Sequence, residues 1–235
     1  MSSPSPSLPT PYTTHVARPE YRSVYEPAED TFLLLDALEQ DRDELRSMAP
    51  AVCMEVGSGS GCVATFLGQL LEGARPCIWA TDINPAANRC TLETGRVNGV
   101  RAGLEAVQTS LARGLAGRMR GMVDVLVFNP PYVVTVSEEV VRPPAPGNGR
   151  DLAAAAWAGG VDGREVVDEF WPDVDTLLSP GGVFYLVAIA ENRPLEIIGY
   201  LASRFGLAGS VALSRKAGCE HLCVLKFRRH GALAA

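Results

Sequence analysis

Apolar runs of strand length alternate with helix-like segments along most of this 235-residue chain. The pattern predicts strands at residues 51–57, 77–83, 103–109, 123–129, 181–189, 209–216 and 220–228, and helices at residues 31–38, 61–72, 85–98, 163–178 and 194–205. Such alternation indicates an α/β fold with a mostly parallel sheet and helices on both faces. Only residues 217–219 separate the last two strands, so these strands should form an antiparallel hairpin. The sequence therefore predicts a seven-stranded sheet with one antiparallel strand.

Length and composition favour one domain. With 235 residues, 47% of them hydrophobic, the chain can bury a single full core, which we place at residues 21–230. Residues 1–20 are rich in Ser, Pro and Thr and are predicted to be a disordered tail. The longest apolar stretch, residues 182–190, is much shorter than the ~20 residues that span a bilayer, and no signal peptide is recognisable. We therefore expect no membrane association and a cytoplasmic or also nuclear location.

The tetrapeptide N-P-P-Y at residues 129–132 ends the predicted strand 123–129, where open α/β sheets place their ligand crevice. The Asn129 side-chain oxygen is one acceptor, and the Pro130 carbonyl is a second, with no competing N–H because Pro131 has none. Two acceptors can hold both hydrogens of a planar NH2 group and turn its lone pair toward an electrophile. Tyr132 offers a flat face for a planar amide or base. Taken alone, a strand-ending turn explains the tetrapeptide equally well.

Upstream, a glycine-rich loop follows the first predicted strand, with glycine at three alternate positions: Gly57, Gly59 and Gly61. Glycines there permit positive φ and present N–H groups at a helix N-terminus. A dinucleotide site is the alternative, and Asp82 would supply the acidic residue that such a site has ~20 residues further on. Glu55 separates the two readings, since a pyrophosphate would repel it whereas the α-amino group of S-adenosylmethionine would bind it. Asp82 could also belong to a helix N-cap with Pro85.

Four stretches together resemble the HemK family, in its eukaryotic and archaeal branch: V-Y-E-P-A-E-D-T at residues 24–31, E-V-G-S-G-S-G at 55–61, T-D-I-N-P at 81–85 and N-P-P-Y-V-V at 129–134. The similarity extends over about residues 24–227. It implies a class I, Rossmann-like methyltransferase fold and S-adenosylmethionine as methyl donor, with S-adenosylhomocysteine as product. It further implies that the target is a glutamine side-chain amide in the class I translation release factor.

The resemblance also implies roles for individual residues. The expected cofactor-binding residues are Thr31, Glu55, Gly57, Gly59, Gly61, Asp82, Ile83, Ser110, Leu111 and Asn129, and the expected catalytic residues are Asn129, Pro130, Pro131 and Tyr132. Ser110 departs from the family pattern, which usually has an Asp that accepts from the adenine amino group. Because a serine brings no charge, we expect weaker cofactor binding than in the relatives.

Residues 133–162 show no regular period and include a Pro-rich stretch, which we interpret as a lid or insertion loop next to the tetrapeptide. Besides Asn129 and Tyr132, Trp157 and Arg164 are the candidates for substrate contact. The substrate itself has alternatives. A histone lysine fits less well, since its ammonium must first lose a proton. The adenine amine of DNA is disfavoured by the net charge of −6. A relative that binds the cofactor without turnover is the alternative that is not an enzyme.

The resemblance implies one partner, a small zinc-binding activator subunit in a heterodimer. Candidate contacts are residues 103–109 and 77–79, although Trp79 could equally be core. The chain itself should bind no metal. The segment C-E-H-L-C at residues 219–223 lies in a predicted strand, where its two sulfurs would be ~13 Å apart, too far for one zinc ion.

Overall fold

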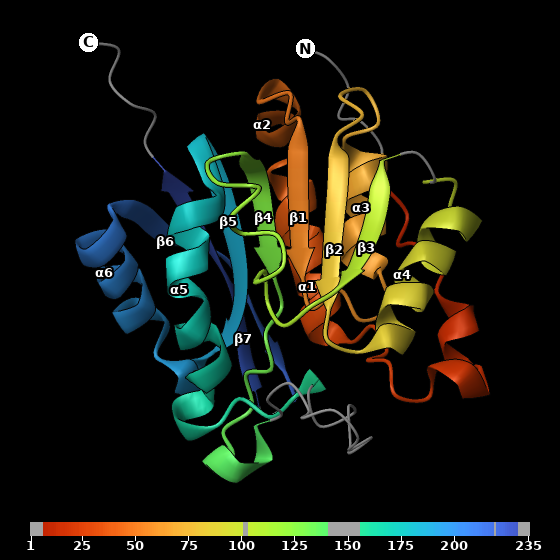
Figure 1. The fold of residues 1–235 in the computed structure, drawn as a ribbon. Helices are drawn as coiled ribbons and strands as arrows, with labels where there is room; N and C mark the ends of the chain where they lie inside the picture. The colour runs from red at the N-terminus through yellow and green to blue at the C-terminus, as the bar shows by residue number, and fades with distance from the viewer. Residues whose placement is uncertain (1–6, 101–102, 141–155, 219, 230–235) are drawn as a thin grey trace.

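The computed structural model describes residues 7–100, 103–140, 156–218 and 220–229. Its strands form one sheet: β1 Val52–Val56, β2 Cys77–Asp82, β3 Leu104–Gln108, β4 Val123–Phe128, β5 Leu178–Ile189, β6 Leu207–Ala217 and β7 Glu220–Arg229. The strand order is β3-β2-β1-β4-β5-β7-β6 (Figure 1). β7 runs antiparallel to both of its neighbours, and the other pairs are parallel. The predicted sheet, including its antiparallel hairpin, is confirmed.

Helices cover both faces of this sheet (Figure 1). The α-helices are α1 Glu29–Gln40, α2 Arg42–Ser47, α3 Cys62–Leu70, α4 Pro85–Val97, α5 Glu165–Leu177 and α6 Pro194–Phe205, and the short 3-10 helices are η1 Thr14–Ala17, η2 Pro19–Tyr21, η3 Ser137–Glu139, η5 Val161–Gly163 and η6 Ala190–Asn192. One core cluster joins α1 and α3 to the sheet, and a second joins α5 and α6 to its other face. α1, α5 and α6 bury an apolar stripe, as amphipathic surface helices should, whereas α3 is buried at most of its positions. None of the helices in the described ranges is long and apolar enough to cross a membrane.

The predicted boundaries mostly agree within about three residues, with two differences. α2 was not predicted, because six residues provide too little periodicity to distinguish a helix from a turn. β5 begins at Leu178 rather than at residue 181. Its first residues include Pro180, Gly181 and Gly182, which favour a turn, and the pairing with β4 changes register there.

The prediction of a disordered segment over residues 1–20 is wrong for residues 7–20. The side chains of His15 and Val16 are buried, and Val16 packs with Tyr21 and Val24 against the α4 side chains Ala86, Ala87 and Cys90. The His15 ring nitrogen Nε2 lies 2.9 Å from Thr94 Oγ1 of the same helix. Composition predicted disorder because Ser and Pro dominate, but a few well-placed apolar residues are enough to dock the segment on α4. Residues 1–6 lie outside the described residues.

The topology brings two distant motifs together. β1 and β4 are neighbours at the point where the strand order reverses, with Val56 opposite Phe128 at their carboxyl ends. A Cβ on Gly57 would lie 3.9 Å from the backbone oxygen of Asn129. The predicted crevice at this switch point is therefore present in the fold.

Candidate active site

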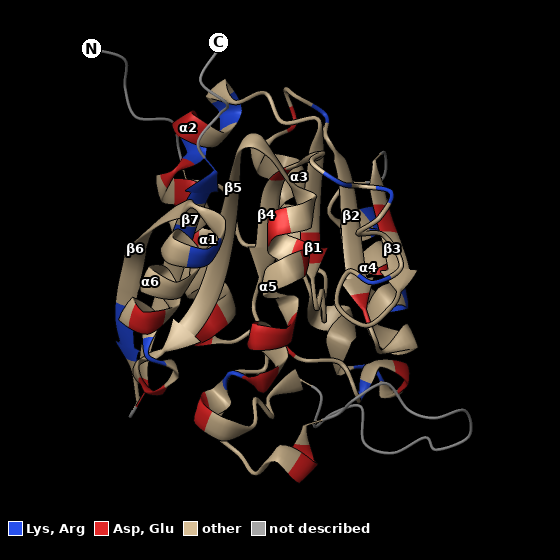
Figure 2. Ribbon diagram, turned by 60° about the vertical axis from the view of Figure 1, so that its left-hand side comes forward, with Lys and Arg blue, Asp and Glu red and all other residues tan. Residues whose placement is uncertain are grey.

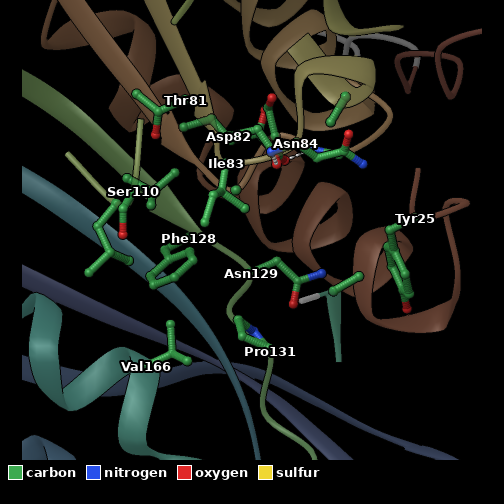
Figure 3. A pocket seen from close by; sticks show the side chains of 18 of the residues that line it. Tyr25, Thr81, Asp82, Ile83, Asn84, Ser110, Phe128, Asn129, Pro131 and Val166 are labelled. Carbon is green, nitrogen blue, oxygen red and sulfur yellow. Dashed lines mark hydrogen bonds between the residues drawn. The ribbon is translucent and has the colours of Figure 1, made fainter. Parts of the chain in front are cut away.

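A pocket lies at the carboxyl ends of β1, β2 and β4 (Figure 3). Its walls are the glycine-rich loop after β1, the turn between β2 and α4, the segment after β3 and the start of the tetrapeptide. Residues 23–25 of the N-terminal segment form a further wall. The Asn84 side chain holds that wall in place by donating to the Ser23 backbone oxygen at 2.9 Å. The pocket is thus built from segments that are far apart in the sequence.

The three loop glycines have two different roles. All three have positive φ, of 67° at Gly57, 49° at Gly59 and 76° at Gly61. Gly57 and Gly59 line the pocket, as predicted for cofactor-binding residues. Gly61 does not line it; a Cβ there would lie 2.5 Å from the Cα of Thr91 in α4. The expectation of a cofactor contact at Gly61 is therefore replaced by a packing role, in which the missing side chain lets α4 approach the loop closely.

Glu55 is buried beneath the loop at the end of β1 and lines the pocket. Its Oε2 accepts a hydrogen bond from the Ala64 backbone N–H in the first turn of α3, at 2.8 Å. Burial raises the pKa of Glu55 well above its ordinary value, and the Ala64 N–H only partly opposes this. One oxygen thus fixes the start of α3, and the residue still borders the pocket, so both functions predicted for this carboxylate are compatible.

Asp82 ends β2 and connects three parts of the site. Its Oδ2 accepts from the Gly59 N–H at 2.9 Å, and its Oδ1 accepts from the Asn84 N–H at 2.8 Å. Burial raises the pKa of Asp82, and these N–H donors counteract the rise. Asn84 is the N-cap residue of α4, with Pro85 at the first helical position. Asp82 therefore both lines the pocket and holds the turn before α4, as the sequence allowed.

The segment after β3 supplies the next wall of the pocket, with Ser110 and Leu111. Leu111 has a φ of 52°, an uncommon value for a leucine. The Ile83 and Ser110 side chains both border the pocket (Figure 3), and Thr31 at the start of α1 lines it as well. These predicted cofactor residues are thus brought together, and a planar ring between Ile83 and Leu111 would meet only apolar side-chain surface.

Asn129 lies at the centre of a group of polar side chains, the Asp30 cluster, formed by Tyr25, Asp30, Asn129 and Tyr132. The buried Asp30 Oδ2 accepts from Asn129 Nδ2 at 3.0 Å, from the Tyr25 hydroxyl at 3.0 Å and from the Tyr132 hydroxyl at 3.2 Å. Burial and the Asp30 charge raise the pKa of both phenols, so both remain neutral. Asn129 Oδ1 is buried and has no hydrogen-bond partner among the described residues. The site therefore contains an acceptor that is ready for an N–H donor.

Not every predicted site residue reaches the pocket. Of the tetrapeptide, Asn129 and Pro131 line it, whereas Pro130 and Tyr132 are not among its lining residues. Trp157 is 44% exposed and its backbone oxygen accepts from the Val133 N–H. Arg164 forms ion pairs with Asp168 and Glu196.

Trp157 and Arg164 therefore do not line the pocket as substrate contacts, because backbone pairing and helix-start ion pairs hold them elsewhere. The loop that contains Trp157 does reach the pocket, through Val140, Ala156 and Ala158. A lid over residues 133–162 stays a prediction, because residues 141–155, with the Pro-rich stretch, lie outside the described residues.

Asp30 is the residue that sequence reasoning missed. It lies within the stretch that resembles HemK proteins, but in the sequence it is one of two adjacent acidic residues of the kind that stabilise a helix N-terminus. Its neighbour Glu29 fits that description. The helical spacing of the buried residues separates Asp30 from Glu29. Asp30 lies three, four, seven and eight residues before Leu33, Leu34, Ala37 and Leu38, so it falls on the buried face of α1.

The chain is similar to known methyltransferases in sequence and in fold. No family model matches the sequence. "Methyltransferase HEMK2" of Mus musculus is 52% identical over 225 residues, which cover 96% of this chain and 99% of the mouse protein. "eRF1 methyltransferase catalytic subunit mtq2" of Schizosaccharomyces pombe is 39% identical and covers 95% of this chain and 97% of its own length. The solved E. cuniculi Mtq2 structure, in complex with Trm112, is 27% identical, with a TM-score of 0.60 over 88% of this chain and 99% of that one.

The seven-stranded sheet and the pocket at its switch point define a class I methyltransferase. The first and fourth strands meet there, with the glycine-rich loop on one and the tetrapeptide on the other. Within that class, the chain belongs to the HEMK2/Mtq2 family of methyltransferases. The resemblance to HemK proteins in the four sequence stretches is confirmed.

Proposed function

We propose that this enzyme transfers a methyl group from S-adenosylmethionine to the side-chain amide nitrogen of a glutamine in a class I release factor. The observation that carries the proposal is the buried, unpaired Oδ1 of Asn129 at the wall of the pocket. Such an atom costs free energy unless a ligand pairs with it, and an amide NH2 is a suitable donor. The fission yeast and E. cuniculi relatives are described as eRF1 methyltransferases, which supports this choice of target.

The pocket residues fit S-adenosylmethionine from end to end. Glu55 and the loop N–H groups suit its amino-acid end, and Asp82 suits the ribose hydroxyls. Ile83 and Leu111 suit the faces of the adenine ring. When bound, the cofactor supplies an electrophilic methyl group on a sulfonium. Asn129 borders the same pocket, so the target nitrogen and the methyl group would meet there.

The tetrapeptide provides the groups that would hold the target amide. Asn129 Oδ1 would accept one hydrogen of the glutamine NH2. The carbonyl of Pro130, which stands between the two tetrapeptide residues that line the pocket, would accept the other. This grip holds the nitrogen lone pair toward the methyl group and stabilises the positive charge that develops on nitrogen. Asp30 already accepts five donors, from Asn129, Tyr25, Tyr132 and both the N–H and the hydroxyl of Thr31. The proton can leave after methylation, so no strong base is needed in contact with the amide.

The alternative substrates fit the site less well. Adenine in DNA would bring a polyanion to a rim where η3 exposes Glu138 and Glu139 and where Glu169 borders the pocket. In Figure 2, red ribbon marks acidic residues on the segments below the sheet. A histone lysine would require a base beside its ammonium. Binding without turnover would leave the intact tetrapeptide and its unpaired acceptor unexplained.

We also propose a small zinc-binding activator subunit as partner, in a cytoplasmic heterodimer. The E. cuniculi relative was solved in complex with a second protein, Trm112, which supports a partner of this kind. β3 forms one edge of the described sheet, so its outer backbone groups are available for pairing. Of the other candidate contacts, Cys77 is exposed, whereas Ile78 is buried and Trp79 packs against the core beneath α5 and α6. The edge strand is therefore the better candidate surface.

The test is transfer of labelled methyl groups by the chain alone and by the chain co-expressed with the activator subunit. The acceptors are a class I release factor, the same factor with its target glutamine replaced by alanine, a histone and an adenine-containing duplex. We expect label on the unaltered factor only, and more of it with the activator. Label that persists after the glutamine is replaced, or label on the histone or the duplex alone, would reject the proposed target.

The pH dependence of cofactor binding should report on Glu55. Its pKa in the folded protein lies above its value in the unfolded chain, so ionisation destabilises the apo protein as the pH rises. Cofactor binding needs the ionised form and should strengthen over the same interval, as the pH rises from the ordinary pKa of a glutamate toward the raised pKa of Glu55. Calorimetry with S-adenosylhomocysteine and thermal unfolding of the apo protein would measure the two opposite trends. In Glu55→Gln, the pH dependence of cofactor affinity and the pH dependence of stability should both become weaker. The same two dependences in the variant and the natural protein would contradict the role of Glu55 in cofactor binding.

Ser110→Asp should tighten cofactor binding by about threefold to tenfold, since a charged acceptor forms a stronger hydrogen bond with the adenine amino group than a hydroxyl does. Calorimetric titration with S-adenosylhomocysteine would measure the change. Ser110→Ala is the matched control and should weaken binding or leave it the same. Weaker binding by Ser110→Asp than by the natural protein would show that the adenine amino group does not face this position.

A further inference from the structure

We infer that Asp30 is a positioning residue that fixes the Asn129 amide with its oxygen toward the target, so that the site selects an NH2 group and rejects an isosteric carboxylate. The inference rests on the proposed function, because it concerns how the target nitrogen is held. Asp30 is not among the pocket-lining residues, so it acts through Asn129 and the two tyrosines.

Asp30 determines which way the Asn129 side-chain amide faces. An ionised carboxylate only accepts hydrogen bonds. Asp30 Oδ2 lies 3.0 Å from Asn129 Nδ2, so the amide must present its NH2 to Asp30 and its Oδ1 elsewhere. That Oδ1 is the atom without a partner. A rotated amide would place oxygen against oxygen at Asp30 and a donor at the position where the target NH2 has to bind.

Asp30 also fixes the two phenol hydroxyls of the cluster. The Tyr25 and Tyr132 hydroxyls use their single hydrogens on Asp30 Oδ2, at 3.0 and 3.2 Å. Only lone pairs of these oxygens remain for anything else. Burial and the Asp30 charge raise both phenol pKa values, so neither hydroxyl loses this hydrogen near neutral pH. Asp30 thus takes up both phenol hydrogens and one hydrogen of the Asn129 NH2, and Asn129 Oδ1 remains as an acceptor.

Position 30 needs a carboxylate rather than an amide, because both of its oxygens accept hydrogen bonds. Asp30 is 3% exposed, and within the described ranges no Lys or Arg forms an ion pair with it. The Thr31 N–H donates to its other oxygen at 2.6 Å, at the N-terminus of the twelve-residue helix α1. An asparagine at position 30 would have one acceptor oxygen in place of two. If that oxygen accepted from the Thr31 N–H, the new NH2 would face the donors of Asn129, Tyr25 and Tyr132. Such a contact between donors would favour an Asn129 amide rotated by 180°.

The consequence is a site that distinguishes glutamine from glutamate. The two side chains have the same shape, but a glutamate would bring two acceptors against Asn129 Oδ1 and add a charge near Asp30. Sites that hydrogen-bond a specific polar group reject analogues lacking it far better than apolar pockets reject a missing methyl group. Asp30 would therefore determine specificity as well as rate.

The experiment compares the natural protein with Asp30→Asn and with Asp36→Asn. Asp36 carries the same change on the exposed side of α1, where it pairs with Arg215. In Asp30→Asn we expect kcat for the release factor to fall about 10- to 100-fold, whereas the Kd for S-adenosylhomocysteine changes less than about threefold. The preference for a glutamine peptide over the matching glutamate peptide in competition binding should shrink about tenfold. Asp36→Asn should change none of these values.

A readout without substrate separates this inference from the proposed function. The side-chain NH2 of Asn129, assigned by its loss in Asn129→Ala, should exchange slowly with solvent in the natural protein and faster in Asp30→Asn, by nuclear magnetic resonance. If the natural protein methylates no glutamine but shows this difference, the proposed function fails and the positioning role stands. Unchanged amide exchange, or unchanged kcat and peptide preference in a folded Asp30→Asn, would overturn the inference.

Discussion

Asn129→Ala should lower kcat for methyl transfer by about 10²- to 10³-fold, because it removes an acceptor that the site keeps unpaired for the target NH2. The protein should still fold. Asp30 retains the two phenol hydroxyls and the Thr31 N–H, so the lost hydrogen bond costs only about 1 kcal/mol of unfolding free energy. Single-turnover kinetics with the release factor would give the rate of the chemical step.

The control for Asn129→Ala is cofactor affinity, measured by calorimetry with S-adenosylhomocysteine. Most of the pocket wall comes from the glycine-rich loop and the turn after β2, so the Kd should change less than about fivefold. A variant that binds cofactor normally and retains more than a tenth of its turnover would contradict the assigned role. A variant that loses the cofactor altogether would assign Asn129 to cofactor binding instead.

Gly61→Ala should be among the most destabilising single changes in the chain. The new Cβ would lie 2.5 Å from the Thr91 Cα, a backbone atom that cannot rotate away, and φ is 76°. The combined clash and backbone strain should cost about 2–4 kcal/mol, which lowers Tm by roughly 5–15 °C in a domain of this size. Because the same loop lines the pocket, the affinity for S-adenosylhomocysteine should fall together with stability. Thermal unfolding and calorimetry would measure both effects.

Gly199→Ala is the matched control for Gly61→Ala. It lies on the exposed side of α6, where a Cβ meets no atom within 4 Å. Alanine is the better helix former, so this variant should be stabilised by about 0.5–1 kcal/mol. Equal loss of stability in the two variants would show that the close approach of α4 to the loop is not what requires glycine at position 61.

The fold was largely predictable because its determinants are local. Each buried strand is an apolar run, and the short connection before β7 permits only a hairpin. The ordered segment 7–20 was missed because its stability comes from α4, more than sixty residues away in the chain, and not from its own composition. Local patterns contain no information on such a partner.

The site was predictable to the extent that each residue acts by itself. Glu55, Asp82, Ser110 and Asn129 carry groups that a cofactor or target can contact directly, and all four line the pocket. Asp30 and Gly61 act through other residues, one by orienting Asn129 and the other by making room for Thr91. Relations of this kind depend on three-dimensional neighbours, which a single sequence does not disclose. Trp157 and Arg164 were chosen by position in a loop, and their backbone and ion-pair partners could not be foreseen.

The N-terminal wall of the pocket affects where the start codon of such a gene should be assigned. A reading frame that started just after Tyr25 would keep the glycine-rich loop, the acidic turn and the tetrapeptide, and would still be recognised by those signatures. Its product would lack Ser23 and Val24 from the pocket wall, and Asp30 would lose the Tyr25 hydroxyl. Start sites assigned to homologous genes should therefore be checked against the docking of this segment on α4, and not only against the presence of the motifs.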